Sequence, residues 1–487
     1  MKTNTSLFFL CALMALTSSA SAYAAEPADS ARTDSVKKRP WMAAAEIMTV
    51  NLLVMGYDHL FLDMPCYRVT SQSIKDNFKL KRWWWDSDYY HTNALNHPYH
   101  GALYYTAARD NDLDIGVSSL MTLGGSLTWE LFCESERPAF NDLITTPVGG
   151  ITLGEPMHRI SERVLDDSKR GLERVGREVV AFAINPVKGI NRLLRGDTWR
   201  VKGCSSDSHQ QMEAYVETGI RRLDISDRHS FNTPYLMLDV NYGDAMGEEG
   251  HGLFDYFTLR LTAIAGKEQP HVSSLMVKNQ LWCRSLGEKG TTKAVVGLYN
   301  HYDYTNSLPN YEGTTEGQRM RKPYGYMEIA SIGPGIAFRT GNRTRWEQQL
   351  FVNGIGLGAT PIDTEHKSGN NHGYSFGSGY GARMTTDLRV DNWLHAAVNG
   401  KFSQLFCWDG FFDDDPDRKM GASGKSIQGE EGNAVTFIAE PTLEIMPFQH
   451  FGIGLHGRYF WCHSNYKHHP HATTHSWELH AGVCYRF

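Results

Sequence analysis

The fold is decided by the last stretch of the chain, S-W-E-L-H-A-G-V-C-Y-R-F, residues 476–487. Every second residue from Trp477 to Phe487 is apolar or aromatic, and the residues between them, from Glu478 to Arg486, are mostly polar. Successive side chains of a β-strand point to opposite faces. A strand over this stretch therefore has one apolar and one polar face, which is typical of transmembrane β-barrels, where lipid-facing and lumen-facing residues alternate.

The same alternation recurs through residues 205–487 and predicts an antiparallel barrel of about twelve strands. The strands are expected near residues 211–223, 233–244, 251–266, 270–286, 292–304, 323–339, 343–357, 375–390, 392–408, 433–446, 449–464 and 474–487. Clusters of Gly, Asn, Asp and Pro separate them, as expected of turns. An even number of strands brings both ends of a closed barrel to one side of the membrane, which we expect to be the periplasmic side.

The inward faces of these strands carry charges of both signs. They include Asp239, Arg260, Arg345, Glu347, Glu440, Glu444, Arg458, Glu478 and Arg486. We expect them to cross-link the lumen wall as ion pairs, and a path for a solute or ion is the alternative. Barrels of about eight strands are filled by side chains, whereas those of sixteen or more hold water. Twelve strands leave the pore size open.

The N-terminal segment predicts export from the cytoplasm. Lys2 precedes an apolar run, Ser6–Thr17, and Ala20-Ser21-Ala22 resembles a cleavage site, so residues 1–22 are expected to be a signal peptide. Residues 23–38 are polar and are expected to form a disordered linker. A periplasmic helical domain is then predicted over residues 39–204, and the transmembrane β-barrel over residues 205–487.

Composition excludes several classes of protein. The net charge of −6 comes without a basic stripe, so no nucleic-acid partner is expected. No uncharged apolar run of helical length follows the signal segment, which argues against a helical inner-membrane protein. Apart from Cys11, the cysteines are odd in number, widely spaced and without a C-x-x-C pair, so neither a disulfide framework nor a zinc ribbon is expected.

Helical periodicity dominates the first part of the chain. Helices are predicted near residues 41–61, 97–110, 113–134, 141–167, 170–183 and 189–197. Gly149, Gly150 and Gly154 lie in the longest of them. Because glycine has no side chain, these positions are expected to let a neighbouring helix approach closely.

Six short motifs in this part resemble one family. They are N-H-P-Y-H-G-A-L-Y at residues 96–104, G-S-L-T-W-E at 125–130, N-D-L-I at 141–144, G-G-I-T-L-G-E-P-M-H-R-I-S at 149–161, R-G-L-E-R at 170–174 and N-P-V-K-G-I-N-R-L at 185–193. Together they resemble domain-of-unknown-function family 3943, found in uncharacterised envelope proteins of Gram-negative bacteria. The resemblance covers roughly residues 75–200 and implies an envelope domain without a known activity. The order Glu130, Asp142 and Gly149-Gly150 is more distantly similar to VanZ-like helical membrane proteins.

Six polar residues of the helical part form the candidate catalytic site. They are His97, His100, Glu130, Asp142, Glu155 and His158. Glu155 and His158 share a helical face, as in di-iron bundles, but those bundles use two such pairs, and H-E-x-x-H is absent. We therefore predict no metal and no cofactor. We favour a structural interpretation, a buried network in which nearby arginines, such as Arg109 and Arg159, pair with the carboxylates.

The sequence as a whole predicts an α+β protein with an N-terminal helical domain and a C-terminal outer-membrane β-barrel. We expect a structural or transport role in the envelope, with the helical domain as a periplasmic plug or cap. One alternative is an enzyme, a hydrolase or transferase that modifies envelope lipid or cell wall through the six residues. Another is a module that docks a periplasmic protein through Lys188–Arg200. The expected partners are outer-membrane lipid and the barrel-assembly machinery, since the strand ending in Phe487 resembles the signal by which outer-membrane barrels are recognised.

Overall fold

A computed structural model describes residues 38–61, 68–85, 88–201, 211–225, 229–247, 252–266, 269–307, 325–361, 374–408, 431–467 and 470–487. These residues form two compact units, one helical and one a barrel, and the barrel unit includes the short segment Tyr89–His91. The last described helix ends at Arg195 and the first strand begins at Met212. Residues 202–210 between them lie outside the described ranges, as do the expected signal peptide and nearly all of the expected linker.

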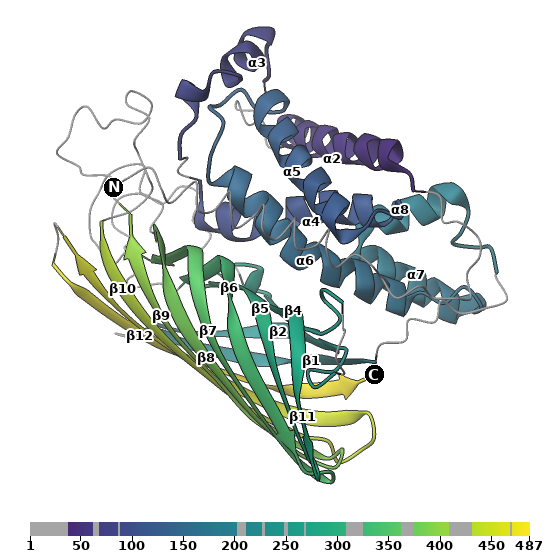
Figure 1. The fold of residues 1–487 in the computed structure, drawn as a ribbon, viewed down its shortest axis with the longest axis vertical. Coiled ribbons are helices and arrows are strands. Elements are labelled where there is room, and N and C mark those ends of the chain that lie inside the picture. The colour runs from purple at the N-terminus through teal and green to yellow at the C-terminus, as the bar shows by residue number, and fades with distance from the viewer. Residues whose placement is uncertain are drawn as a thin grey trace. The chain divides into compact units, whose positions relative to one another are not determined.

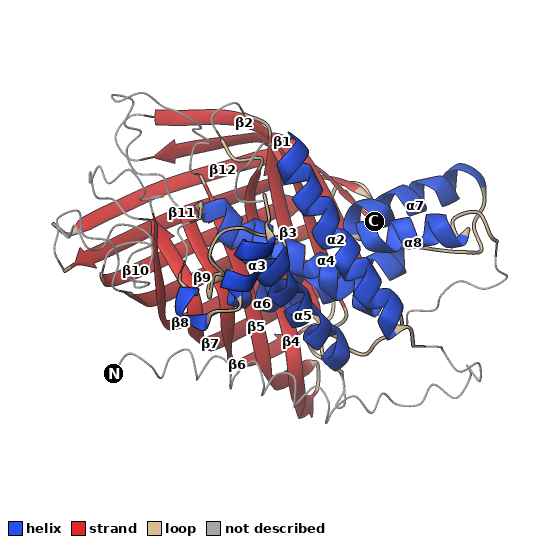
Figure 2. Cartoon of the chain, turned by 90° about the horizontal axis from the view of Figure 1, so that it is seen from above, coloured by secondary structure: helices blue, strands red, loops and turns tan. Residues whose placement is uncertain are grey.

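Seven α-helices build the described part of the helical unit (Figures 1 and 2). They are α2 (Pro40–Phe61), α3 (Ser71–Asn77), α4 (His97–Arg109), α5 (Ile115–Phe132), α6 (Asp142–Val164), α7 (Gly171–Ile184) and α8 (Pro186–Arg195). Six of them confirm the predicted helices to within a few residues, and α3 was not predicted. Among the described residues, no helix combines the length and the apolar character that are needed to span a membrane.

Glycines set the contact between α4 and α6. A Cβ atom at Gly150 would come within 2.4 Å of the Gly101 backbone, and one at Gly154 within 2.7 Å of the Tyr105 ring. Such distances are shorter than real Cβ contacts, so larger residues would push the helices apart. The expected close approach at these glycines is therefore confirmed, and it brings the polar side chains of the two helices within hydrogen-bonding reach.

The barrel unit is a closed antiparallel sheet of twelve strands, in which β1 pairs with β12. The strands are β1 (Met212–Ile225), β2 (His229–Tyr242), β3 (Phe257–Ile264), β4 (Val272–Lys289), β5 (Thr292–Asn306), β6 (Gly325–Thr340), β7 (Thr344–Pro361), β8 (Tyr374–Val390), β9 (Leu394–Cys407), β10 (Gly432–Ile445), β11 (Phe451–Tyr466) and β12 (Ala472–Arg486). Each pairs with its neighbours in sequence (Figure 1). The predicted strand number and order are confirmed.

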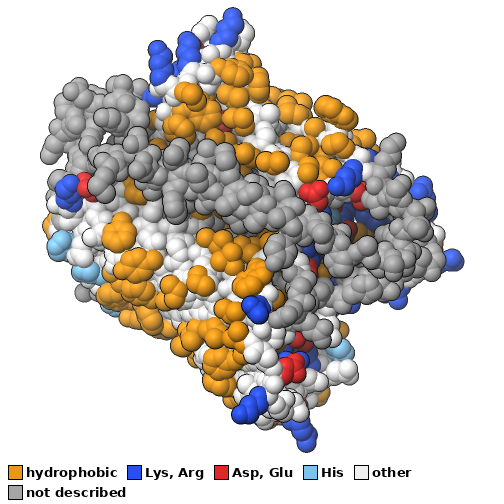
Figure 3. All heavy atoms as spheres, in the orientation of Figure 1, with side chains coloured by type: hydrophobic (Ala, Val, Ile, Leu, Met, Phe, Trp, Pro, Cys, Tyr) orange, Lys and Arg blue, Asp and Glu red, His pale blue; other side chains and the backbone are white. Residues whose placement is uncertain are grey.

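The two faces of the barrel wall differ as the alternation in β12 predicts. Trp477 is 42% exposed on the outer face, whereas Glu478 is only 2% exposed and points into the lumen. Hydrophobic side chains cover the part of the wall that faces the viewer in Figure 3. Exposed apolar residues of the strands include Ile220, Leu236, Ile336, Leu350, Val352, Met384, Phe402, Phe437, Leu443, Ile453, Leu455, Leu479 and Val483.

An apolar cluster fills one end of the lumen. It consists of Leu223, Tyr326, Ala434, Ile438, Phe460 and Cys462. Most of these residues lie near the strand ends that are joined by the long connections, residues 307–324 and 408–431. At this end the described side chains pack together instead of lining an open channel.

Candidate functional site

Glu155, on α6, has no exposed surface and accepts hydrogen bonds from three side chains. Arg109 Nε lies 2.8 Å and Arg159 Nε 2.7 Å from its carboxylate oxygens, and the Tyr105 hydroxyl donates over 2.9 Å. Burial alone would raise the pKa of Glu155, but the charges of Arg109 and Arg159 outweigh it and hold this pKa far below its usual range. Glu155 is therefore a permanently ionised acceptor that ties α6 to α4.

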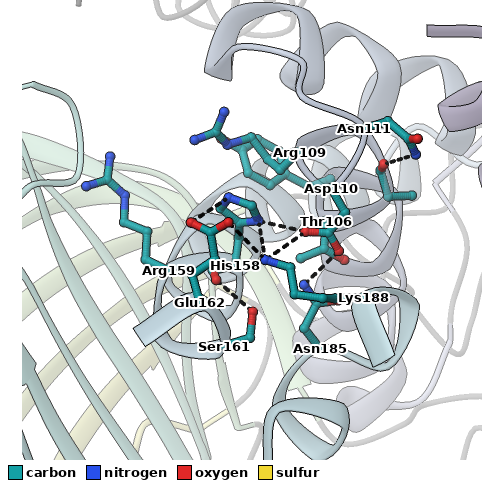
Figure 4. A network of polar contacts seen from close by, with 12 residues as sticks. Thr106, Arg109, Asp110, Asn111, His158, Arg159, Ser161, Glu162, Asn185 and Lys188 are labelled. Atoms are coloured by element: carbon teal, nitrogen blue, oxygen red, sulfur yellow. Dashed lines mark hydrogen bonds and ion pairs between the residues drawn. The ribbon is translucent and has the colours of Figure 1, made fainter. Parts of the chain in front are cut away.

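His158 lies one helical turn further along α6 and belongs to a second polar cluster, shown in Figure 4. Its Nδ1 atom is 2.8 Å from Asp110 Oδ1, at the end of α4. Lys188 Nζ, from α8, lies 3.1 Å from the same Asp110 oxygen and 3.2 Å from Glu162 Oε1. Asn185 donates to the second Asp110 oxygen over 3.0 Å. The end of α4, α6 and the start of α8 therefore meet at Asp110.

The electrostatics of this cluster favour a charged carboxylate. Burial acts to raise the pKa of Asp110, but the Lys188 ammonium and the hydrogen bond with His158 outweigh it, so this pKa is below its ordinary value. A cavity of about 190 Å³ lies beside the cluster and is lined by Asp110, Glu162 and Lys188, among others. His158 is not one of the lining residues, but its Asp110 partner is. An imidazole oriented by a buried carboxylate has the arrangement of a general acid or base.

The other candidate residues lie in separate environments. His97 Nε2 is 3.2 Å from Asp142 Oδ1. His100 Nε2 is 2.9 Å from the Tyr104 hydroxyl, and burial, together with the charge of His97, lowers the pKa of His100 to about 3. Glu130 accepts from the Ala139 backbone N–H over 2.7 Å. The structure thus pairs His97 with Asp142 and leaves the six residues distributed over several clusters.

Two buried serines, Ser126 on α5 and Ser161 on α6, lie close to the candidate residues. The Ser161 hydroxyl donates to the His158 carbonyl oxygen over 2.7 Å, and the Ser126 hydroxyl to the Asp142 carbonyl oxygen over 3.4 Å. Both hydroxyls are bonded to backbone and neither lines the cavity beside His158. In the described ranges, no three His, Cys, Asp or Glu side chains are grouped as metal ligands.

Sequence reasoning missed Asp110, Asn185 and Lys188 as site residues. One signal was available, because Asp110 directly follows the last residue of α4. A carboxylate is unfavourable at the C-terminal end of a helix dipole, so its presence there points to cationic partners elsewhere in the chain. The partner Lys188 could not be assigned, since it lies far away in sequence and reaches Asp110 only through the packing of α8.

The lumen of the barrel holds a second candidate site. Ion pairs cross-link its wall, as expected from the inward charges. Arg260 Nη2 is 2.5 Å from Asp239, Arg339 Nε 2.8 Å from Glu347, and Arg458 Nε 2.7 Å from Glu440. Among the inward charges named from sequence, Arg345 and Arg486 are the exceptions, with no carboxylate of the described residues within 4.0 Å.

A polar cavity of about 320 Å³ remains between these ion pairs. It reaches from Gln211 and Glu213, where β1 begins, to Tyr326 and Ile438, which belong to the apolar cluster. The cavity therefore ends against packed apolar side chains. Its volume is within the range of small-molecule binding sites.

Comparisons with known proteins give one family match, within the helical part, and no activity. Residues 82–187 match the family described as domain of unknown function DUF3943. No curated protein matches the chain.

Among solved structures, OmpT of Vibrio cholerae is similar at 6% identity and a TM-score of 0.23, over 57% of this chain and 97% of that one. Omp33 of Acinetobacter baumannii is similar at 13% identity and a TM-score of 0.21, over 57% and 98%. The outer-membrane channel DcaP of the same species is similar at 10% identity and a TM-score of 0.20, over 57% and 97%. These values are too low to transfer any property of those proteins to this chain.

Proposed function

We propose that the chain is an integral outer-membrane protein whose barrel anchors the helical domain in the envelope and does not form an open diffusion pore. The supporting observation is a closed ladder with an apolar outer face. In a bilayer every backbone polar group needs a partner within the protein, and a closed barrel meets this requirement. An aromatic ring is typical of the membrane interface. Exposed aromatic residues near one end of the barrel, Trp346, Trp393, Phe448, Phe451 and Phe487, fit this role.

The lengths of the connections support a periplasmic start of β1, and we propose the same side for the helical domain. The strand ends on the side of the barrel termini are joined mainly by short connections, residues 290–291, 341–343, 391–393 and 446–450, with 243–256 as the exception. Outer-membrane barrels have short periplasmic turns and longer extracellular loops. The residues that precede β1 therefore leave the barrel on the periplasmic side. A cysteine placed at exposed Ser168 should react with an impermeant maleimide only after the outer membrane is opened, and labelling in intact cells would reverse the orientation.

The filled end of the lumen favours an anchor over a pore. Tyr326 and Phe460 are each no more than 1% exposed and pack within the apolar cluster. Purified protein in a planar lipid bilayer should therefore give no sustained conductance. Replacing both Tyr326 and Phe460 by alanine should open a water path and raise conductance. The control is Phe437→Ala, which truncates an outward-facing side chain of β10 that is 42% exposed. Steady open-channel conductance of the unmodified chain would overturn the proposal.

The partners in assembly are part of the same proposal. The C-terminal strand is recognised by the barrel-assembly machinery and then closes the barrel by pairing with β1. Phe487 is 71% exposed, and its backbone N–H donates to the Ala214 carbonyl over 3.0 Å. Its side chain is therefore accessible for recognition before or after closure.

An enzyme is the second candidate, and the His158–Asp110 pair beside its cavity favours it. The described lining residues include no serine, threonine or cysteine, so the chemistry would be general acid or base catalysis on an envelope lipid or cell-wall component. The test is a lipid and muropeptide profile of cells that lack the protein, complemented with wild type, His158→Gln or the exposed control Asp112→Asn. A profile restored by wild type and the control but not by His158→Gln, at equal folded yield, would place the enzyme first.

Docking of a periplasmic protein through Lys188–Arg200 receives less support. The basic residues of this stretch are used in internal ion pairs. Arg192 Nη2 is 2.7 Å from Glu178, Arg195 Nη2 3.8 Å from Glu46, and Arg200 Nη1 3.5 Å from Asp197. A partner with an acidic surface would have to compete with these carboxylates.

A further inference from the structure

The charged groups around the lumen cavity are unevenly paired. Every lining carboxylate that the structure describes has a cationic partner within 4.0 Å. They are Glu213, Asp239, Asp244, Asp303, Glu347, Asp387 and Glu440. Of the lining lysines and arginines, Lys278 and Arg345 have no carboxylate of the described residues within this distance. Among the described lining residues, two cations therefore lack a carboxylate partner, whereas every carboxylate has a cationic partner.

The polar atoms of the cavity wall that lack a hydrogen-bond partner also favour an anion. Among the described lining residues, three have a buried polar side-chain atom without a hydrogen-bond partner in the described part of the chain, and all three atoms are nitrogens: His301 Nε2, Arg345 Nε and Arg383 Nε. The two arginine atoms can only donate. The Lys278 ammonium has three N–H donors. Among the described residues it donates one side-chain hydrogen bond, to Gln349 Oε1 over 2.5 Å. Such groups call for an acceptor that the described wall does not supply.

Three of these groups gather at the middle of the cavity. Lys278 on β4 lies directly opposite His301 on β5. The Phe351 ring, on β7, is 5.0 Å from the His301 ring and 5.4 Å from Lys278 Nζ. Phe351 lies directly opposite Arg383 on β8. The lumen wall therefore combines donors with an aromatic surface at this level.

Glycine on the intervening strand makes this arrangement possible. Gly335 of β6 lies opposite Phe351, and a Cβ atom there would come within 2.3 Å of the Phe351 ring. A larger residue would displace the ring from its place beside His301. The absence of a side chain at Gly335 is thus what lets β5 and β7 contact each other across β6.

The neighbouring charges do not neutralise Lys278. Arg383 and Lys401 both pair with Asp303 and Glu328, so these four charges balance one another. The nearest oxygen recorded for Lys278 belongs to an uncharged amide. Glu347 and Asp387 also attract the Lys278 ammonium, but each is already paired with an arginine. Lys278 therefore keeps part of its attraction for an anion inside the lumen, where charges interact more strongly than in bulk water.

Arg345 is the second lining cation without a carboxylate partner among the described residues, and it lies closer to the end of the barrel where β1 begins. It lies directly opposite Arg389 on β8, and like charges in this position repel each other. Arg389 is compensated by Asp387 and Glu213, and Arg345 is not. At about 3.3 Å per residue, Arg345 lies roughly 13 Å along β7 from Gln349, the partner of Lys278.

We propose that the lumen cavity binds a small organic anion, with its carboxylate at Lys278 and His301 and its apolar body against Phe351 and Tyr256. Lys278 Nζ lies 5.3 Å from the Tyr256 ring, which together with Phe351 gives the anion's body two aromatic surfaces. Arg345 attracts the anion at the end of the cavity where β1 begins. This ligand class goes beyond the proposed anchoring function, which assigns no ligand to the lumen.

The test is a titration of the full chain in neutral detergent, followed by ¹⁹F NMR of the ligand. The probe is 4-fluorobenzoate, and the matched neutral ligand is 4-fluorobenzamide. We expect saturable binding of the benzoate at one site and at least about tenfold weaker binding of the amide, since a hydrogen bond to a charged group is stronger than one to a neutral group. Lys278→Met should weaken benzoate binding about tenfold or more. The control Lys293→Met, at a 49% exposed lysine of β5, should not.

Folding of each variant is checked by the difference in gel migration between unboiled and boiled samples. Should Lys278→Met fail this check, His301→Gln replaces it, and the same loss is expected. Absence of saturable benzoate binding by wild type, equal affinity for the amide, or unchanged affinity in the folded Lys278 or His301 variant would overturn the proposal. Displacement of the benzoate by a lower concentration of inorganic phosphate would overturn the assignment to organic carboxylates.

Discussion

Replacing Glu155 by glutamine should strongly destabilise the helical unit. The substitution keeps the shape of the side chain but removes its charge, which leaves Arg109 and Arg159 facing a neutral amide in a site with no exposure. Breaking a buried ion pair by removing one partner costs about 3–5 kcal/mol. Because a unit of this size loses about 2–4 °C per kcal/mol, the melting temperature should fall by about 6–20 °C.

The assay is thermal melting of the full chain in detergent, followed by circular dichroism at 222 nm, where helices dominate the signal. Glu173→Gln is the matched control, because Glu173 pairs with Arg177 on the surface of α7, and its melting should be unchanged. A melting temperature of Glu155→Gln within 2 °C of wild type would refute the conclusion that this carboxylate ties α6 to α4.

The pH dependence gives a second readout of the same variant. Because the folded pKa of Glu155 is lowered, its stabilising effect is complete above the unfolded value, about pH 4.3, and is lost as the pH falls below it. The wild-type protein should therefore lose more stability between pH 5 and pH 3 than Glu155→Gln does. Parallel losses in both proteins would contradict the assignment.

Three further predictions concern other parts of the chain. Deleting Phe487 should reduce the amount of protein in the outer membrane without reducing secretion, measured by fractionation and immunoblotting; an unchanged outer-membrane yield would count against terminal recognition. Gly150→Ala should destabilise the helical unit because the new Cβ meets the Gly101 backbone, whereas Gly176→Ala on α7, with nothing within 4 Å, should be neutral or stabilising in the same melting assay. His100, with its pKa lowered to about 3, should stay neutral from pH 8 to pH 5 in histidine NMR spectra, and a midpoint near pH 6.5 would contradict its burial.

Much of the barrel could be predicted from sequence because strand alternation is a local property. The apolar and polar faces of β12 can be read from consecutive residues, and the same holds for the other strands. The even number of strands and the aromatic end of the chain are compatible with a closed barrel, and the pairing of β1 with β12 shows the closure. The filling of the lumen could not be predicted, since Lys278 and Gln349 meet from strands that are not neighbours in the sheet.

The helical site was predictable only in part, for a similar reason. The spacing of Glu155 and His158 predicts a shared helical face, and in the structure both side chains contact the end of α4. Their partners differ, however, because Arg109 and Asp110 are adjacent residues of opposite charge. Which of them each side chain meets depends on the close contact of α4 and α6 at Gly101 and Gly150, which spacing along one helix does not specify.

The measurement that tests the central claim most directly is the migration of the outer-membrane fraction on a gel, with and without boiling. A closed twelve-strand ladder has no free edge through which detergent can unravel it, so the unboiled protein should run as a compact species, ahead of the boiled one, and should be found with the outer membrane. Identical migration in both states, with the protein in the soluble fraction, would contradict an outer-membrane barrel.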